Sequence, residues 1–437
     1  MRNTSLISAI KRVVGVKAST MLSISVKFIS SSDSTLAYSP IVIDKLNFKQ
    51  DYLNLYTDDI TLEFRLATAD YATLYAHLQD LHVILTMKSV SEEGVIDLYL
   101  TPTQQTYRAI IINPRDVTKE VTDASKRTEI DTSIKVRLIE DDIYIARQQS
   151  LHTVYQTMPV KDVIRSMTNA FGLTSLDLIE PDNIHKYDHV VLPAMQSFAN
   201  AYEWVQAKYG VYMCGMNHYY TRGVLYVYAP YDTSPVTRNT LTVYQAETGY
   251  CQGSSIFHRV TNGNTELVTN TIHAAHDGAL AAGENHGTAT SYLRASGIVD
   301  GIVSVNPTTG PQFVDDTSLT IALNDPKLAA SGTVKNKYAT MTDNPFALAT
   351  NIAMHHSTSV HIEWNHAVPY VLTPGQKVSY NSDENGLVRC RSGILEGIVY
   401  SIGRLTRAAG SDIYACKASL TLRLDPIGTL TSAVQSS

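Results

Sequence analysis

The chain has 437 residues, which is more than one hydrophobic core usually serves, so two or three domains are expected. Charged residues make up only 17% of the sequence, whereas about a quarter is usual, and the formal net charge is -6. This balance argues against a protein that holds nucleic acid on a basic surface, but it leaves room for a channel through which nucleic acid passes.

Neutral residues must therefore form much of the surface. The 26 tyrosines far outnumber the 8 phenylalanines and 2 tryptophans, and tyrosine suits half-buried strands and interfaces because its ring packs while its hydroxyl finds a polar partner. The four cysteines, Cys214, Cys251, Cys390 and Cys416, lie far apart without metal-ligand or redox spacing. They are interpreted as small buried hydrophobes in a reducing compartment.

Residues 1–20 predict an amphipathic N-terminal arm or helix. The basic residues near the start do not precede a continuous apolar segment, and no stretch approaches the length of about 18 apolar residues that a membrane span needs. Neither a signal peptide nor a membrane anchor is therefore expected. The apolar side of the arm comprises Leu6, Ile7, Ile10, Val13 and Val14.

Residues 21–113 predict a first β domain with one short helix. Apolar and polar residues alternate over 22–29 and 60–66, as in half-buried strands. Residues 69–81 change to three- and four-residue spacing, which predicts a helix packed on the sheet. Further strands are expected at residues 41–48, 95–100 and 107–112.

Residues 114–150 are rich in charge and predict a connector, in which only 130–139 alternates as a strand. The run Glu140, Asp141 and Asp142 follows that strand. Three adjacent carboxylates could bind a metal ion, but no other ligand type lies nearby, so a solvated turn is the favoured interpretation.

Residues 151–247 predict a helical middle segment. Helices are expected at 159–171 and 193–209, since each begins with proline and is followed by glycine. Strands are expected at 211–214, 223–229 and 241–246.

Residues 248–425 predict a second β domain, a barrel or sandwich with one helix near 345–354. A loop is expected at 278–287 and another at 306–311. Residues 426–437 form a C-terminal tail. The predicted strands of this domain lie at 359–364, 370–372, 378–380, 393–402 and 413–424.

A search for catalytic or metal-binding motifs finds no phosphate-binding loop, dinucleotide fingerprint or nucleophile elbow. On a strand, His361 and Glu363 would share a face and could bind a metal or act as an acid–base pair. Their His-x-Glu spacing is that of zinc deaminases, but the accompanying Pro-Cys-x-x-Cys is missing. The rest of this histidine cluster consists of His355, His356 and His366, with Trp364 among them.

A second set of potential ligands is His273, His276 and Asp277, although on a strand the two histidines would point to opposite faces. Surface or interface histidines are the favoured alternative for both sets. No metal ion, cofactor or catalytic residue is therefore expected.

Acidic pairs could in principle cleave a glycosidic bond, but the pairs in this chain lie beside strand ends, where solvated turns are expected. These residues are Asp58, Asp59, Glu92 and Glu93. The basic residues Lys126, Arg127, Arg404 and Arg407 are scattered and do not build a nucleic-acid site.

Several segments together resemble the baseplate hub proteins of contractile-tailed bacteriophages. Residues 56–71 resemble the strand and helix entry of a tube-like hub domain, and the stretch from Ser197 to Tyr212 is similar to the hub segment that returns to the sheet. Residues 372–378 and 393–399 resemble small barrel strands of hub and spike-junction proteins. The resemblance spans most of the chain, but each motif is a strand-and-turn pattern without fixed chemistry, and 278–311 matches no hub segment.

The resemblance implies a non-enzymatic structural protein of the virion tail, assembled in the host cytoplasm. It implies two tube-like domains per chain and a homotrimer that joins a sixfold tail tube to a threefold spike, with baseplate wedge proteins around it. Strands within 211–229 would return to the first domain, and DNA would pass through the ring without specific binding. Another tail protein, such as a tube initiator or an arm protein, is the first alternative, and a carboxylate-dependent cell-wall hydrolase is the second.

Overall fold

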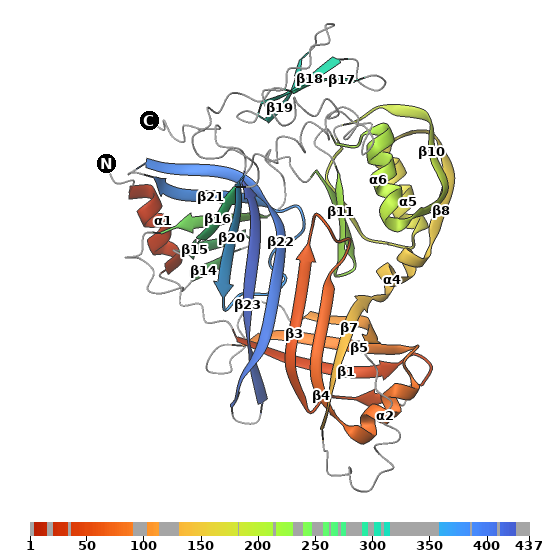
Figure 1. Cartoon of the computed structure of the whole chain (residues 1–437), viewed down its shortest axis with the longest axis vertical. Coiled ribbons are helices and arrows are strands. Elements are labelled where there is room, and N and C mark those ends of the chain that lie inside the picture. The colour runs from red at the N-terminus through yellow and green to blue at the C-terminus, as the bar shows by residue number, and fades with distance from the viewer. Residues whose placement is uncertain are drawn as a thin grey trace.

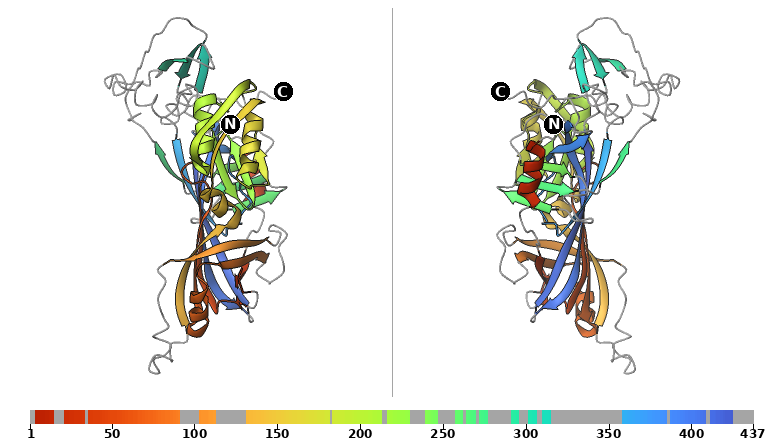
Figure 2. Two further views of the ribbon diagram at one scale, coloured as in Figure 1. Left: turned by 90° about the vertical axis from the view of Figure 1, so that its right-hand side faces the viewer. Right: turned by 90° about the vertical axis from the view of Figure 1, so that its left-hand side faces the viewer.

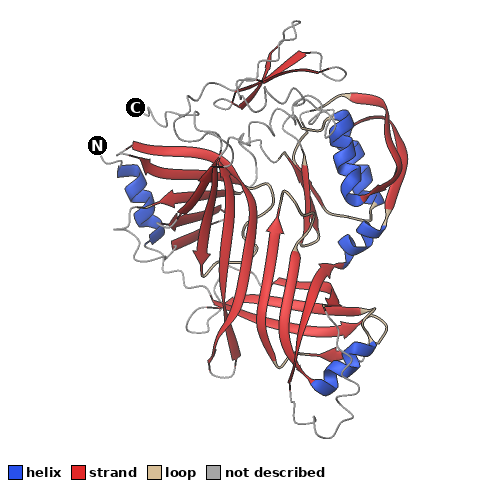
Figure 3. Cartoon of the chain, viewed as in Figure 1, coloured by secondary structure: helices blue, strands red, loops and turns tan. Residues whose placement is uncertain are grey.

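The structure is a computed structural model, and it describes a mainly β molecule with five short helices and one large mixed sheet, which confirms the predicted mainly β class (Figures 1 and 3). No helix among the described residues is long and apolar enough to cross a membrane. The described residues are 4–14, 21–33, 36–90, 103–112, 131–181, 183–212, 216–229, 239–246, 257–261, 264–269, 272–276, 291–295, 301–306, 310–314, 358–384, 387–408 and 411–424.

Eight strands, called here the first strand group, pair in the closed order β1-β5-β6-β7-β4-β3-β22-β23, because β23 pairs back onto β1 at Leu22 and Tyr414. Alternation builds its core: every second side chain of β4 from Ile60 to Leu66 is buried. The strands are β1 (Met21–Ser30), β3 (Val42–Asp51), β4 (Asp59–Ala67), β5 (Leu81–Val90), β6 (Thr103–Ile111), β7 (Asp131–Glu140), β22 (Leu387–Ala408) and β23 (Ser411–Leu424).

A second strand group continues the same sheet in the order β14-β15-β13-β21-β22-β23-β20-β16. It shares β22 and β23 with the first group, and in the described strands its path ends at β14 and β16. Its other strands are β13 (Thr240–Gln245), β14 (Phe257–Thr261), β15 (Asn264–Thr269), β16 (Ile272–His276), β20 (Thr358–Asn365) and β21 (Lys377–Glu384).

The long β22/β23 hairpin is thus a wall of both groups. Residues 387–394 of β22 pair with β21, whereas residues 397–403 pair with β3. The register shifts between Leu395 and Gly397, so a bulge marks the change from one group to the other. The extra residue, Glu396, is buried and paired with Arg423 at 2.7 Å.

A helical lobe lies on the right in Figure 1, after the first group in sequence. Its core includes the apolar stripe of α5, which buries Val160, Val163, Ile164 and Met167. Its elements are α4 (Asp141–Gln148), β8 (Ser150–Pro159), α5 (Val160–Ala170), β9 (Leu176–Leu178), β10 (Lys186–Ser197), α6 (Phe198–Tyr209), β11 (Asn217–Thr221) and β12 (Val224–Tyr228).

The predicted N-terminal helix is confirmed as α1 (Thr4–Val14), and Leu6, Ile10 and Val13 are buried against the second strand group. The predicted helix of the first β domain is confirmed as α2 (Thr68–Ala76), where Tyr71 and Leu74 reach the main core, but it is shorter than the expected 69–81, because Leu81 already begins β5. The remaining strands are the short β2 (Ala37–Tyr38) and a separate three-stranded sheet of β17 (Ser291–Ala295), β18 (Gly301–Asn306) and β19 (Gly310–Val314).

One expected boundary and two expected strands are wrong. The helix expected from Pro193 begins at Phe198, because residues up to 197 pair with β8 and Pro193 occupies a bulge, where no ladder N–H is needed. Val211 and Tyr212 form a bend held by the side chain of Gln206, not a strand. Residues 370–372 form a turn, in which Tyr370 has φ 63°.

Other predictions fall on residues that the structure does not describe. They are the strand at 95–100, the loop at 278–287, the helix at 345–354 and the tail at 426–437.

Candidate functional site

The β11–β12 hairpin separates two cores. Side chains on one of its faces, Tyr219 and Tyr228, belong to the core of the strand groups, whereas Tyr220, Leu225 and Val227 on the other face belong to the core of the helical lobe. A period-two strand can serve two cores in this way because successive side chains point to opposite faces. The hairpin is therefore where the lobe is joined to the sheet.

Asp58, at the end of the loop before β4, is the polar centre of this junction. Only 6% of it is exposed. Its carboxylate accepts hydrogen bonds from Gln50 Nε2 at 2.9 Å, Tyr219 OH at 3.0 Å and Thr221 Oγ1 at 2.8 Å. Burial raises the pKa of Asp58, and these donors partly offset that effect by stabilising the charged form.

A second layer of hydrogen bonds ties the hairpin to the first strand group. Asn217 Nδ2 donates to the Tyr52 carbonyl at 2.8 Å, and Tyr52 OH donates to Gln50 Oε1 at 3.1 Å. The ring of Tyr219 packs edge-on against that of Tyr52, with centroids 4.9 Å apart. Two of the donors to Asp58, Gln50 and Tyr219, are thus themselves fixed by contacts with Tyr52.

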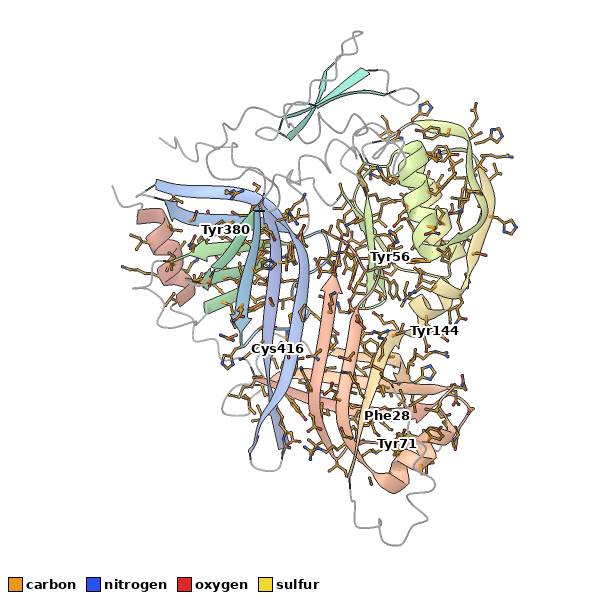
Figure 4. All side chains as sticks on the ribbon, in the orientation of Figure 1. Phe28, Tyr56, Tyr71, Tyr144, Tyr380 and Cys416 are labelled. Carbon is orange, nitrogen blue, oxygen red and sulfur yellow. The ribbon has the colours of Figure 1, made fainter. Side chains whose placement is uncertain are left out.

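Tyr56 makes the contact on the lobe side (Figure 4). Its carbonyl accepts from the Tyr220 N–H at 2.8 Å, and its hydroxyl donates to Glu203 of α6 at 2.8 Å. Its ring stacks on His218 at 4.8 Å, and His218 in turn stacks on Tyr202 at 4.6 Å. Burial lowers the pKa of His218 to about 3, so this imidazole is neutral.

The turn of the hairpin is anchored by Glu140. Arg222 and Gly223 have positive φ angles of 53° and 76°, so their backbone N–H groups point together. The carboxylate of Glu140 accepts both, at 2.7 Å and 2.8 Å. Glu140 is 7% exposed, and burial raises its pKa to about 7.

Arg222 connects the hairpin to the segment that precedes β21. Its NH1 group donates to the Tyr370 carbonyl at 3.0 Å, and its guanidinium lies over the Tyr370 ring at 5.1 Å. The Tyr370 hydroxyl lies 3.4 Å from that of Tyr107 on β6. The first strand group, the second strand group and the lobe therefore meet at one buried network.

The polar groups of this network stabilise the packing of the lobe on the strand groups. Both carboxylates are buried and are engaged by donors of the chain itself, so neither is presented to a substrate. Among the described residues, no group of three or more His, Cys, Asp or Glu could hold a metal ion.

The stability of the folded chain should depend on the protonation of Glu140. Because its pKa is raised from 4.5 to about 7, the native state binds a proton more readily than the unfolded state. The stability contributed by this proton is fully present below the unfolded pKa and is lost as the pH rises through about 7. We expect the free energy of unfolding of the wild type, minus that of Glu140→Gln, to fall by about 2 kcal/mol between pH 5 and pH 8.

Urea unfolding at the two pH values measures this difference. His218 and His258, whose pKa values burial lowers to about 3 and about 4, act in the opposite direction but are common to both proteins and cancel. A difference that is constant across this range would show that Glu140 stays ionised in the folded chain.

The run of Glu140, Asp141 and Asp142 was expected as a solvated turn, which is wrong. Glu140 is the N-cap residue of α4 and is buried, and Asp141 and Asp142 form the first turn of that helix. Asp141 binds His82 Nε2 at 2.7 Å and Arg108 Nε at 3.0 Å, and Asp142 accepts from Tyr220 OH at 3.1 Å. Glu140 and Asp141 thus fasten the lobe to the first strand group, while Asp142 joins α4 to β11 within the lobe.

One of the acid pairs that were expected in solvated turns also lies elsewhere. Asp58 was expected in a solvated turn and instead lies in the junction, while Asp59 pairs with Arg137 at 3.0 Å on β4. Glu92 and Glu93 are outside the described residues, as are Lys126 and Arg127. Arg404 pairs with Asp412 at 3.2 Å, and Arg407 lies on β22.

His361 and Glu363 do share the exposed face of β20, as expected of a strand. The β16–β20 register places His273 opposite His361, and His361 Nδ1 lies 3.2 Å from Thr421 Oγ1. His276 pairs with Thr358 in the same ladder, and His366 has φ 52°. His355, His356 and Asp277 fall outside the described residues.

The cysteines of the described part of the chain are free: Cys390 is half-buried, and Cys416, which is labelled in Figure 4, is buried. Burial raises the pKa of the Cys416 thiol, which suits the predicted role of a small hydrophobe. Cys214 and Cys251 are not among the described residues.

One grouping that the sequence did not suggest, Ser30, His77 and Asp80, resembles a catalytic triad only in composition. Ser30 Oγ donates directly to Asp80 at 2.5 Å, and the same nitrogen of His77 faces both partners, at 3.5 Å and 3.7 Å. A triad needs the histidine between the two, with one nitrogen for each. The three residues close the turn before β5.

The fold and the junction define a mainly β protein whose parts are fastened together by buried polar contacts. Its fold is similar to a tail protein from Neisseria meningitidis MC58, with a TM-score of 0.45 and 10% identity over 93% of this chain and 98% of that one. It is also similar to the 43 kDa tail protein of prophage MuSo2 from Shewanella oneidensis, with a TM-score of 0.42 and 8% identity over 93% and 100% of the two chains.

A third match is the E. coli c3393 protein, described as a type VI secretion component with structural similarity to the T4 bacteriophage tail proteins gp27 and gp5. The TM-score is 0.38, with 10% identity over 87% of this chain and 73% of that one. Two of these matches are described as tail proteins, and the third is described as structurally similar to tail proteins. No family model matches the chain, and no curated protein matches it.

Proposed function

We propose that this chain is the structural hub of a phage tail baseplate, which joins the tail tube to the central spike as a homotrimeric ring. The observation that carries the proposal is the β22/β23 hairpin, a wall common to two groups of eight strands. One chain thereby offers two β-walled surfaces whose relative position is set by the β22–β23 ladder, which runs through both groups.

Each strand group is taken here as one tube-like domain. The first comprises residues 21–140, the part of β22 that pairs with β3 (397–403) and the part of β23 around Tyr414 that pairs with β1. The second comprises residues 240–384, the part of β22 that pairs with β21 (387–394) and the part of β23 that pairs with β20 (417–424). Three chains with two such domains each would present six similar surfaces to a sixfold tube while keeping threefold symmetry toward a spike. Among the described strands, the main path of each group has eight strands, β2 beside β1 not counted, and this supports the proposed duplication.

The buried junction has a defined task in this proposal. A ring that matches two symmetries must hold its domains in fixed positions, and the contacts of Asp58, Glu140 and Arg222 fasten the lobe to both strand groups. Binding energy would come from large neutral interfaces without turnover, in the virion tail. Tube, spike and wedge proteins would be the partners, and DNA would pass through the ring.

Native mass spectrometry of the purified chain tests the ring. The proposal predicts a species of three chains, or a multiple of three, that persists on dilution to nanomolar concentration. A chain that remains monomeric at all concentrations would contradict it. Adding the spike protein from the same particle should shift the mass by three further chains.

A further inference from the structure

The β8/β10 ribbon forms the outer margin of the helical lobe (Figures 1 and 2). In the described part of the chain it consists of two strands, so each strand has one edge that faces away from its partner. Such an edge carries a row of N–H and C=O groups that can pair with another strand. The two edges of this ribbon differ in whether other parts of the chain cover them.

The edge of β10 is closed. The N–H of Val191 donates to Tyr209 OH at 2.8 Å, and the Val191 carbonyl accepts from Trp204 Nε1 at 3.0 Å, both from α6. The strand also contains Lys186, Asp188 and Pro193, which are residues that discourage edge pairing.

The edge of β8 has none of these protections from Ser150 to Gln156. The strand contains no Asp, Glu, Lys or Arg. Because the main chain of Val191 points away from β8, its register partner Val154 likewise points its N–H and C=O away from β10. Alternation gives His152 and Gln156 the same direction, and no described residue bonds to these outward groups of Val154.

An apolar surface adjoins this open edge. Val154 and Val191 lie directly opposite each other on the face away from α5 and α6, and they are 48% and 45% exposed. The open stretch is short, because Thr157 has φ 50° and kinks the strand and Gln149 ends α4 just before it. A partner must therefore be a short extended segment without charge and with an apolar residue at its centre.

We infer that β8 pairs with β8 of a second copy of this chain, antiparallel and about a twofold axis at Val154. In this register Val154 faces the second copy's Val154, and His152 faces Gln156 in both directions, so every outward backbone group from 152 to 156 finds a partner. The two ribbons become one four-stranded sheet. An apolar row, Val191 and Val154 of each copy, crosses its outer face, and no charged side chain of β8 opposes it.

The substitution Val154→Pro tests this pairing directly. Proline removes the outward N–H of residue 154 but no bond of the β8–β10 ladder, so the ribbon itself is expected to remain intact. Val154→Lys is a second variant, which places a charge at the axis. Ile110→Lys is the matched control, since Ile110 is 41% exposed but lies on β6, outside the ribbon, where it pairs with Arg137 of β7.

Sedimentation velocity and native mass spectrometry give the readout, with circular dichroism confirming that each variant is folded. The wild type and Ile110→Lys are expected to contain twice as many chains as Val154→Pro and Val154→Lys. Equal masses for the wild type and both Val154 variants would overturn the inference.

The same masses separate this inference from the proposed ring. Six chains that fall to three in the Val154 variants support both. Three chains in all proteins would overturn the β8 pairing and leave the ring standing, whereas two chains that fall to one would support the pairing and contradict the ring.

Discussion

Replacing Asp58 with leucine is expected to lower the free energy of unfolding by about 3 kcal/mol, because three buried donors lose their acceptor at once. These donors are Gln50 Nε2, Tyr219 OH and Thr221 Oγ1, each within 3.0 Å of the carboxylate. Water cannot replace the lost acceptor without opening the junction. Asp58→Asn, which keeps the shape and one acceptor oxygen, should lose less than the leucine variant.

Asp59→Leu is the matched control. Asp59 is the next residue and pairs with Arg137, but that pair lies at the surface and contributes about 1 kcal/mol or less. Urea unfolding of the three variants and the wild type measures the difference. If Asp58→Leu were as stable as Asp59→Leu, the polar junction would contribute nothing to holding the lobe in place.

Replacing Gly397 with alanine is expected to cost about 3 kcal/mol, because the new Cβ would lie 2.7 Å from the Gln50 carbonyl oxygen, a backbone atom that cannot rotate away. Gly397 stands where β22 passes from one strand group to the other, and its register partner is Asp51 at the end of β3. Relief of the contact requires β22 and β3 to separate at this point. We therefore expect both a lower melting temperature and weaker ring assembly.

Gly403→Ala on the same strand is the control for this substitution. A Cβ at Gly403 meets no atom within 4 Å, so alanine should be neutral or stabilise the strand by about 0.5 kcal/mol through its lower conformational freedom. Differential scanning fluorimetry of both variants is sufficient. Equal melting temperatures would show that the Gly397 contact relaxes without cost.

The sequence predicted the elements whose periodicity is clean. The stripe of α5 and the alternation of β4 each belong to a single core, so one face is apolar and the other polar. Of the β11–β12 hairpin, the sequence predicted the second strand, at 223–229, but not the first, because both faces of the hairpin are buried in different cores and its residues show no contrast. Strand β8 was not predicted for the opposite reason: neither of its faces is buried in a core, since its side chains are at most half-buried.

The candidate site was also hidden from the sequence for a physical reason. Adjacent acids such as Glu140, Asp141 and Asp142 are ordinarily solvated, and only the fold reveals that two N–H groups 82 and 83 residues away converge on Glu140. A local signal did exist at the other end. The dipeptide Arg222-Gly223 between two short strands indicates a tight turn, and a tight turn exposes N–H groups that an acid can bind.

The most direct test of the central proposal is an electron-microscopy class average of the purified assembly viewed along its axis. The account predicts threefold symmetry and, in each closed ring of three chains, an inner wall with six similar lobes that alternate between the first and second strand groups. A ring with three lobes, or particles without rotational symmetry, would contradict the proposal that the β22/β23 hairpin joins two equivalent tube-like domains.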